Sequence, residues 1–443
     1  MARRWFQIAA VLTAGVSLVT ACGGVGGDKS SKKGGPITTQ GFSLPDEIAK
    51  VRIAEARKAV GDIKVNEGAF DQQQFLSSVA AGSPTDLVYI DREYLGTYAS
   101  RGAIQPLDSC ISKQGIKMDQ FRQPAVDQVK LKGKTYGVPE FNNVRVLITN
   151  NTAVSDAHLD GVRTSDWSAL TQAATAMARQ SGGKLSRIGF DPKIPEFLPM
   201  WAHANGVDLI SKDGKKVHLT DPRVVEALQF TVDLINKQGG WASFKAFRDS
   251  WDFFGGKNEF VADQLGSFPM ENFYVNTLSS LSPSAGITVT PFTDRNNQPM
   301  TWATGNAWAI PKGAKHFDKA CRFIKVMTDP KTWLTAAKAR VKAIQAKHGI
   351  YTGTYTANKV ADEEIFSQVY KPSGNKAFDD AVKTLQTVQE HAFSTPAVPA
   401  GKEIVDAWQS AVNRVLSGQQ SPAAALAQAQ TEAQTALDKA WKG

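Results

Sequence analysis

The chain has 443 residues, of which 42% are hydrophobic and 21% charged, so it can bury cores for two or three domains. Its formal net charge is +9, but the Lys and Arg residues are scattered among acids. Nucleic-acid-binding proteins concentrate basic residues in a stripe with interleaved aromatics, so the composition disfavours that class and indicates a mildly basic surface.

The first residues have the pattern of an export sequence. Arg3 and Arg4 form a short positive region, and residues 8–19 form an apolar stretch too short to span a bilayer comfortably. The following Val-Thr-Ala-Cys at 19–22 resembles a bacterial lipobox. This resemblance implies that residues 1–21 are a signal peptide and that Cys22 is lipidated and becomes the mature N-terminus. An ordinary signal peptide with an accidental cysteine is the alternative.

Residues 22–36 are rich in Gly, Ser and Lys, which predicts a flexible tether. Beyond the tether, strand and helix patterns alternate. The expected elements are a strand at 37–42, a helix at 45–60, a strand at 63–65, a helix at 72–81, a strand at 86–90 and a short helix at 94–100. This alternation predicts βαβ units, in which helices cover a parallel sheet.

A second α/β region follows. Its expected elements are a strand at 144–149, a helix at 167–179, a helix that begins at Pro222, strands at 287–291 and 307–310, and a helix at 317–327. The chain after Lys347 is predicted to be almost entirely helical and ends in an Ala-rich helix that begins near Pro422. No internal repeat is evident.

Seven short segments occur in an order typical of one known family. They are Gln-Phe-Leu-Ser-Ser-Val-Ala-Ala-Gly-Ser-Pro-Thr-Asp-Leu-Val-Tyr-Ile-Asp at 74–91, Gly-Ala-Ile-Gln-Pro-Leu-Asp at 102–108, Gly-Lys-Thr-Tyr-Gly-Val-Pro at 133–139, Asp-Trp at 166–167, the stretches 305–312 and 320–327, and the helix at 418–437. In these segments the chain resembles the extracellular solute-binding proteins of bacterial ABC importers, in the carbohydrate-binding group similar to maltose-binding protein.

The resemblance implies an α/β, two-lobed periplasmic-binding-protein fold of type II. Each lobe would be a mixed, mostly parallel sheet flanked by helices. Lobe 1 would comprise residues 37–142 and 303–345, and lobe 2 residues 143–302 and 346–443. Ligand would bind between the lobes, where the carboxyl ends of strands meet.

The resemblance also implies partners and a location. The expected partners are a carbohydrate ligand and the permease subunits of the importer, with the lipid anchor holding a monomer on the outer face of the bacterial cytoplasmic membrane. No cofactor, metal or nucleic acid is expected. Cys110 and Cys321 would both belong to lobe 1, so a disulfide between them is possible; two buried free thiols are the alternative.

A sugar offers hydroxyl edges and apolar C–H faces, so its site needs planar polar groups and aromatic rings. The expected ligand-binding residues are Phe42, Asp91, Glu140, Asn142, Trp201, Trp251, Glu271, Asn272, Phe273, Trp302, Gly305 and Asn306. Trp302 stands out because it lies among small and polar residues. Each of these positions also has a structural alternative: a Trp is more often core, Asp91 could cap a helix, and Glu140 could pack at a hinge. No cation is among them, which favours a neutral sugar.

Enzyme classes fit less well. The six His residues are far apart, and neither a His-Glu-x-x-His nor a Gly-x-Ser-x-Gly motif occurs. A glycoside hydrolase stays an alternative because its two carboxylates need not be close in sequence. Binding of another solute, such as a glycerol phosphate ester or a polyamine, is the other alternative; a phosphate would need Arg or Lys in the cleft.

Overall fold

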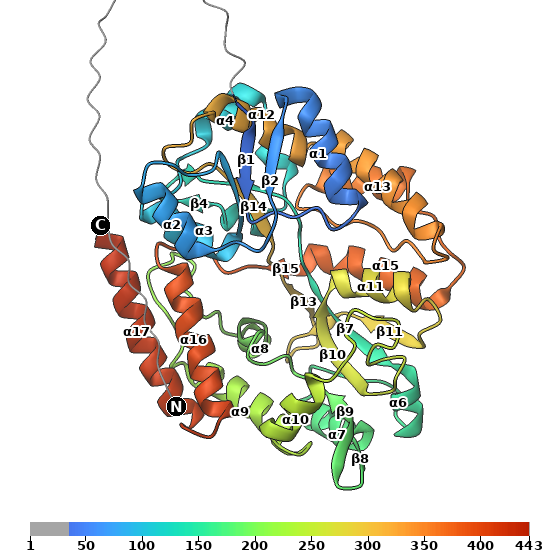
Figure 1. Cartoon of the computed structure of the whole chain (residues 1–443). Helices are drawn as coiled ribbons and strands as arrows, with labels where there is room; N and C mark the ends of the chain where they lie inside the picture. The colour runs from blue at the N-terminus through green and yellow to red at the C-terminus, as the bar shows by residue number, and fades with distance from the viewer. Residues whose placement is uncertain (1–34, 443) are drawn as a thin grey trace, which may run out of the picture. The chain divides into compact units, whose positions relative to one another are not determined.

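The computed structural model describes residues 35–442, so the expected signal peptide, Cys22 and most of the expected tether lie outside the described residues. Two five-stranded sheets, both accompanied by helices, dominate the described part (Figure 1). This confirms the α/β fold with two lobes. We call the parts built around the two sheets the first and the second lobe.

The sheet of the first lobe has the strand order β2-β1-β3-β14-β6. Its strands are β1 (Ile37–Gln40), β2 (Ile63–Asn66), β3 (Leu87–Asp91), β6 (Val138–Pro139) and β14 (Asn306–Ala309). β1 is parallel to β2 and β3, whereas β14 is antiparallel to β3 and β6. The helices beside this sheet are α1 (Glu47–Val60), α2 (Gln72–Ala80), α3 (Arg92–Ser100), α4 (Asp108–Gln114), α5 (Gln123–Asp127), α12 (Phe317–Thr328) and α13 (Pro330–Gln345).

The sheet of the second lobe has the order β11-β7-β10-β9-β8. Its strands are β7 (Arg145–Asn150), β8 (Arg179–Ser181), β9 (Lys184–Phe190), β10 (Leu265–Glu271) and β11 (Ile287–Thr290). Its helices are α6 (Asn151–Asp156), α7 (Trp167–Met177), α8 (Leu198–Ala204), α9 (Pro222–Asn236), α10 (Trp241–Arg248), α11 (Asn272–Leu281) and α15 (Lys376–Val388).

The expectation of mostly parallel sheets is wrong for this second sheet. β9 and β10 are parallel, but β7 is antiparallel to β10 and β11, and β8 is antiparallel to β9. The reason is topological: β7 carries the chain away from the first lobe, whereas β9 and β10 run back toward it. Both sheets are nevertheless mixed, as expected.

Smaller elements complete the fold. They are the hairpin of β4 (Lys130–Leu131) and β5 (Lys134–Thr135), the sheet of β12 (Phe292–Thr293), β13 (Pro299–Trp302) and β15 (Ala392–Phe393), and the 3-10 helices η1 (Met118–Gln120) and η2 (Gln389–His391). Helices begin where polar residues can cap them: the Asp46 side chain accepts from Ala49 N, and the Asp166 side chain caps α7 in the same way.

The chain crosses between the lobes more than once. The stretches 140–144 and 303–305 lie side by side, with Asn143 paired to Thr304, and Phe141 pairs on its other side with Thr356. We call the segments 140–144, 303–305 and 354–358 the crossover strands. The segment 140–144 connects β6 of the first sheet to β7 of the second, 303–305 leads from β13 back into β14 of the first sheet, and 354–358 precedes α14.

The C-terminal helices connect several parts. α14 (Lys359–Gln368) packs on α13, α16 (Gly401–Leu416) contacts both α3 and α9, and α17 (Pro422–Lys442) packs along α16. The expected lobe boundaries stay a prediction. Within residues 35–442, no helix combines the length and the apolar character needed to cross a membrane.

A disulfide joins Cys110 of α4 to Cys321 of α12, with the two α-carbons 5.5 Å apart. Both cysteines are buried in the core of the first lobe, among residues such as Leu107 and Phe323. The bond links parts of the chain that are 211 residues apart in sequence. It therefore fastens the late helix α12 to the early part of the same lobe.

Candidate ligand-binding cleft

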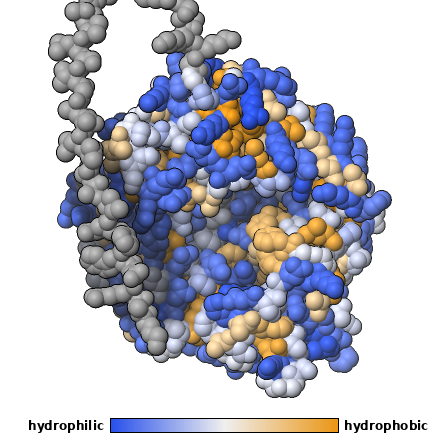
Figure 2. Space-filling model, in the orientation of Figure 1, coloured by the Kyte–Doolittle hydropathy of each residue, from blue (hydrophilic) through white to orange (hydrophobic). Residues whose placement is uncertain are grey.

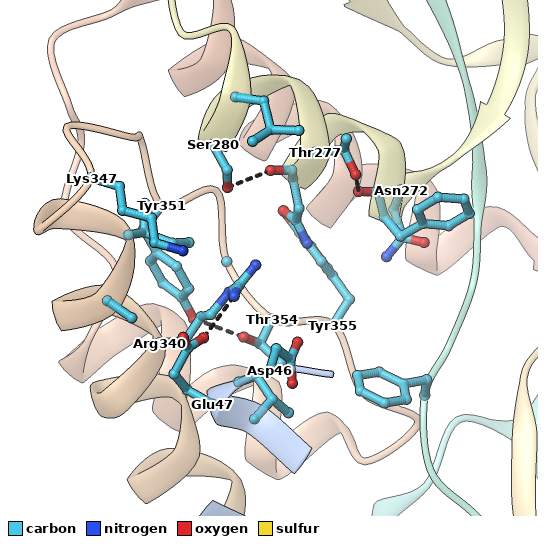
Figure 3. A pocket seen from close by; sticks show the side chains of 18 of the residues that line it. Asp46, Glu47, Asn272, Thr277, Ser280, Arg340, Lys347, Tyr351, Thr354 and Tyr355 are labelled. Carbon is cyan, nitrogen blue, oxygen red and sulfur yellow. Dashed lines mark hydrogen bonds and ion pairs between the residues drawn. The ribbon is translucent and has the colours of Figure 1, made fainter. Parts of the chain in front are cut away.

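A pocket of about 560 Å³ lies between the first and second lobes, and we call it the cleft pocket. Elements of both lobes contribute to it: α1 and α13 from the first, α11 from the second, and the crossover strands between them (Figure 3). Its lining residues are Asp46, Glu47, Ile48, Phe141, Asn143, Phe254, Asn272, Phe273, Asn276, Thr277, Ser280, Leu281, Arg340, Ala343, Ile344, Lys347, Tyr351, Gly353, Thr354 and Tyr355.

The wall from the second lobe is one face of α11, which starts directly after β10. Two rows of side chains with a spacing of four residues lie along this face. One row is polar and consists of Asn272, Asn276 and Ser280. The other consists of Phe273, Thr277 and Leu281. Hydroxyl and amide groups thus lie beside apolar ones along the length of the helix.

The opposite wall carries charges that are balanced. Asp46 and Glu47 lie at the N-terminus of α1, Arg340 lies on α13, and Lys347 lies in the turn that follows α13. An Arg340 nitrogen lies 2.7 Å from a Glu47 carboxylate oxygen (Figure 3). Partial burial of Glu47 opposes its ionisation, but the Arg340 hydrogen bond, a backbone hydrogen bond and the charges of Arg340 and Lys347 together outweigh this and lower the pKa of the carboxyl group. This wall therefore presents a paired rather than a net charge.

A second recess, of about 340 Å³, lies at the carboxyl ends of β1 and β3; we call it the β3 recess. Asp91 ends β3, and the Asn306 amide donates to its carboxylate over 2.6 Å. Tyr94 and Lys402 also line the recess, with the Lys402 ammonium 5.4 Å from the centre of the Tyr94 ring. Desolvation by the surrounding protein raises the pKa of Asp91, although the Asn306 hydrogen bond opposes this.

The two recesses are connected through the crossover strands. Asn143 lines the cleft pocket and is paired with Thr304, and Asn306 of the β3 recess lies two residues beyond Thr304. Figure 2 shows the surface hollowed near its centre, between the lobes, with a hydrophobic patch where β10 ends and α11 begins.

Four of the expected ligand-binding residues line these recesses. Asn272 and Phe273 lie on the cleft pocket, and Asp91 and Asn306 meet in the β3 recess. Asn272 is largely engaged by the protein, because its side-chain oxygen accepts from Val144 N over 3.2 Å. Asp91 sits at the N-cap of α3 but makes no side-chain capping bond, so its structural alternative is not realised.

The structure places Glu140, Asn142 and Phe42 in the protein interior and not on the lining of either recess. The Glu140 carboxylate lies 2.8 Å from Arg52 and accepts from Tyr89 over 3.0 Å and from the indole of Trp308. Asn142 donates to Gln389 over 2.6 Å and accepts from Arg92 over 3.2 Å. Phe42 packs against Tyr89 and Trp308. The polar groups of Glu140 and Asn142 are therefore engaged by other protein groups.

Trp302 is also buried, at 3% exposure, and does not form the open platform that its sequence context suggested. The guanidinium of Arg145 lies over its ring, 4.4 Å from the ring centre, and donates to the Trp302 carbonyl over 2.8 Å. Arg145 also pairs with Glu271 over 3.1 Å. Gly305 does permit a close approach, but of protein: a Cβ there would lie 2.3 Å from the Phe141 carbonyl oxygen.

The two remaining expected tryptophans belong to the core of the second lobe. Trp201 is fully buried, and its indole donates to the Pro192 carbonyl over 2.8 Å. Trp251 is half-buried and packs edge-on against Phe247. In both cases the commoner structural role of a tryptophan holds.

Several lining residues escaped the sequence analysis, among them Phe141, Asn143, Phe254 and Tyr355. Phe141 and Asn143 adjoin predicted positions, and the alternation of a strand could have indicated that 141 and 143 face away from 140 and 142. Phe254 lies in an irregular segment with no periodicity. Arg340 lies on α13, for which the sequence analysis predicted no element, and Lys347 lies just after it. Neither cation was among the expected ligand-binding residues.

The fold and the cleft together define a binding protein with two lobes and a pocket between them. The model of the family described as bacterial extracellular solute-binding proteins matches residues 52–362, more than half of the chain, and the chain belongs to this family. A Brucella abortus (strain 2308) protein named only as a binding protein is 24% identical over 383 residues, which cover 83% of each chain.

Two solved structures extend the likeness to the fold. CpMnBP1 with mannotriose bound has a TM-score of 0.73 and 24% identity, over 90% of this chain and 99% of its own. An ABC substrate-binding protein from Listeria monocytogenes in complex with cycloalternan has a TM-score of 0.71 and 20% identity, over 91% of this chain and 99% of its own. At these identities the likeness establishes a shared fold.

Proposed function

We propose that this protein is the ligand-capturing subunit of an ABC importer and that it binds a neutral sugar in the cleft pocket. The observation that carries the proposal is the lining of that pocket. Aromatic rings, among them Phe141, Phe273 and Tyr355, lie beside the hydroxyl and amide groups of α11. Rings of this kind suit the apolar faces of a sugar, and hydroxyls and amides suit its edges.

The charges of the pocket favour an uncharged ligand. Asp46 and Glu47 balance Arg340 and Lys347, and Arg340 is already paired with Glu47. A phosphate ester would also face the carboxylates of Asp46 and Glu47, and a polyamine would also face Arg340 and Lys347, so neither meets a site of opposite charge alone. The sugars bound in the similar structures, mannotriose and cycloalternan, support the same ligand class.

The mechanism follows from the position of the pocket. Because its walls belong to different lobes, a ligand that contacts both favours arrangements in which the lobes are closer together. The surfaces of both lobes then present a ligand-dependent shape to the permease. Capture by binding alone needs no catalytic group, and we propose that the chain is not an enzyme.

Isothermal titration calorimetry on a panel of mono- and oligosaccharides, sugar phosphates and polyamines tests the ligand class. We expect binding of neutral sugars only. Phe273→Ala should weaken that binding about tenfold, the scale of a lost aromatic contact at a site centre. Binding confined to phosphate esters or polyamines would refute the neutral-sugar proposal and leave the fold assignment intact.

We further propose that the protein is a monomer anchored through a lipid on Cys22 at the outer face of the cytoplasmic membrane. Cys22→Ala should release the protein from membranes or leave its precursor unprocessed, as judged by fractionation and mass spectrometry. A processed Cys22→Ala protein that stays on the membrane would contradict the anchor. Light scattering checks the monomer.

A further inference from the structure

Within the described residues, most of the large apolar side chains that are exposed to solvent lie around one pocket. Among residues 35–442, four are prominent: Phe254 at 66% exposure, Val261 at 49%, Leu281 at 48% and Phe273 at 38%. Phe254, Phe273 and Leu281 line the cleft pocket, and Val261 does not. Exposed apolar groups that gather in one place mark a surface that is covered by something else. We call these three residues the apolar stripe.

Phe254 is held in its exposed position by its neighbours. It occupies a turn in which Gly255 N donates to Asp252 O over 2.8 Å. The preceding Phe253 stacks on Tyr274 with the ring centres 4.2 Å apart and the planes 19° from parallel. The Phe253 and Phe254 rings are almost perpendicular, at 86°. Because Phe253 is held against Tyr274, the turn points the Phe254 ring away from that contact and toward solvent. The exposure of Phe254 therefore does not come from a loose segment.

A second feature fixes the same turn. The Tyr274 hydroxyl oxygen lies 3.0 Å from the Phe253 carbonyl oxygen and 2.6 Å from the carboxylate of the buried Glu259. The protein thus uses a buried polar contact to support a turn whose outer residue is an exposed phenylalanine.

The apolar stripe is longer than one sugar ring. Phe254 lies beside Phe273, with the ring centres 6.4 Å apart and the planes 24° from parallel. Leu281 lies eight residues beyond Phe273 on α11, which is about 12 Å along the helix axis. Asn276, Thr277 and Ser280 lie between these ends and offer hydroxyl and amide groups to the same ligand.

We infer that the ligand is an oligosaccharide of at least two rings whose apolar faces lie along the stripe, and that Phe254 and Leu281 set its length. The inference rests on the proposed function and deepens it. Phe273 and Phe254 contact one end of the ligand, and Leu281 contacts a ring further along. A monosaccharide covers only part of the stripe and leaves the remainder in water.

Titration calorimetry with matched series tests the inference: mannose, mannobiose and mannotriose, and glucose, maltose and maltotriose. In the series that binds, the affinity should rise at least about tenfold from one ring to three, since each covered apolar group adds on the order of 1 kcal/mol. Phe254→Ala should weaken binding of the di- and trisaccharide about tenfold. Leu281→Ser should weaken the trisaccharide more than the disaccharide.

Val261→Ser is the matched control, because Val261 is as exposed as Leu281 but lies outside the pocket. It should leave every affinity unchanged. All three side chains are exposed, so none of the substitutions should lower the melting temperature appreciably, and that measurement identifies any variant that fails to fold.

The possible failures are distinguishable. If neither series binds to the wild-type protein, the proposed function falls, and the inference falls with it. If sugars bind with the same affinity at every length, or if Phe254→Ala behaves like Val261→Ser, the inference alone is overturned. Binding of a monosaccharide as tight as that of its trimer would place the ligand away from the stripe.

Discussion

The crossover strands and the α11 wall both adjoin the cleft pocket, but they differ in which kind of side chain they bury and which they expose. In the crossover strands, the polar residues Glu140 and Asn142 are buried and fully engaged by Arg52 and Arg92. On the α11 wall, the apolar residues Phe273 and Leu281 are exposed. Each region therefore reverses the usual distribution of polar and apolar groups.

The difference separates two roles that sequence patterns confuse. A charged or amide group near a hinge can hold the backbone in place through hydrogen bonds to neighbouring strands, as Arg92 does with the carbonyls of Phe141 and Thr304. A ligand-facing group has to remain available to the ligand. Adjacent residues in one strand can have different roles: Asn142 is enclosed, and Asn143 lines the pocket.

The largest effect should follow from Glu140→Ala. The substitution leaves Arg52 without its carboxylate in a buried site, which should lower the free energy of unfolding by about 3–5 kcal/mol. Urea denaturation followed by circular dichroism measures it. Asp380→Ala, which removes an exposed carboxylate paired with lysines on α15, should leave stability nearly unchanged. Equal losses in the two variants would contradict the scaffold role of Glu140.

A pH-dependent effect of similar size is expected behind the α11 wall. Burial raises the pKa of Glu259 from 4.5 to about 7, although the hydrogen bond with Tyr274 opposes this. Because the folded protein favours the protonated Glu259 carboxyl, this group contributes its full stabilisation below pH 4.5. The contribution is lost as the pH rises to about 7 and the carboxyl ionises. Relative to Glu259→Gln, the wild-type protein should therefore lose about 3 kcal/mol between these values.

Urea unfolding at half-unit steps from pH 4 to 8 checks this expectation. Glu363→Gln, at an exposed position of α14, is the control and should follow the wild-type curve throughout. Parallel curves for the wild-type protein and Glu259→Gln would mean that Glu259 ionises as readily in the fold as in the unfolded chain.

The smallest expected effects give the sharpest contrast, because they come from neighbouring asparagines. Asn143→Ala should weaken sugar binding by about 1–2 kcal/mol, since hydroxyls of the ligand lose a partner, and should hardly change stability. Asn142→Ala should lower stability by about 1–3 kcal/mol, because Arg92 and Gln389 lose a buried partner. Calorimetry measures sugar binding and urea denaturation measures stability in both variants. If both variants lost binding and stability to the same extent, Asn142 and Asn143 would not have separate roles.

Much of the fold was predictable from the sequence, because it depends on local patterns. The buried strand Leu87–Asp91 and the helix that starts after Asp166 follow from hydrophobic periodicity and capping. The directions of β7 and β10 were not predictable, since strand pairing across more than 100 residues leaves no local trace. The order of lobes came from the resemblance alone.

The candidate site was less predictable, for a physical reason. Residue types indicated which groups could bind a sugar, but not whether protein already surrounds them. Trp302 has small and polar neighbours in sequence, yet Arg145 and Phe197 cover it from elsewhere in the chain. Phe254 lacks any periodic context, and its exposure depends on the contact between Phe253 and Tyr274. Whether the recesses bind ligand stays a prediction.

The position of β14 in the first sheet also has a consequence for how the chain is made. β14 lies between β3 and β6, and β6 pairs with no other strand of this sheet. The five-stranded sheet of the first lobe therefore cannot be completed until residue 309 has been synthesised, long after residues 37–139.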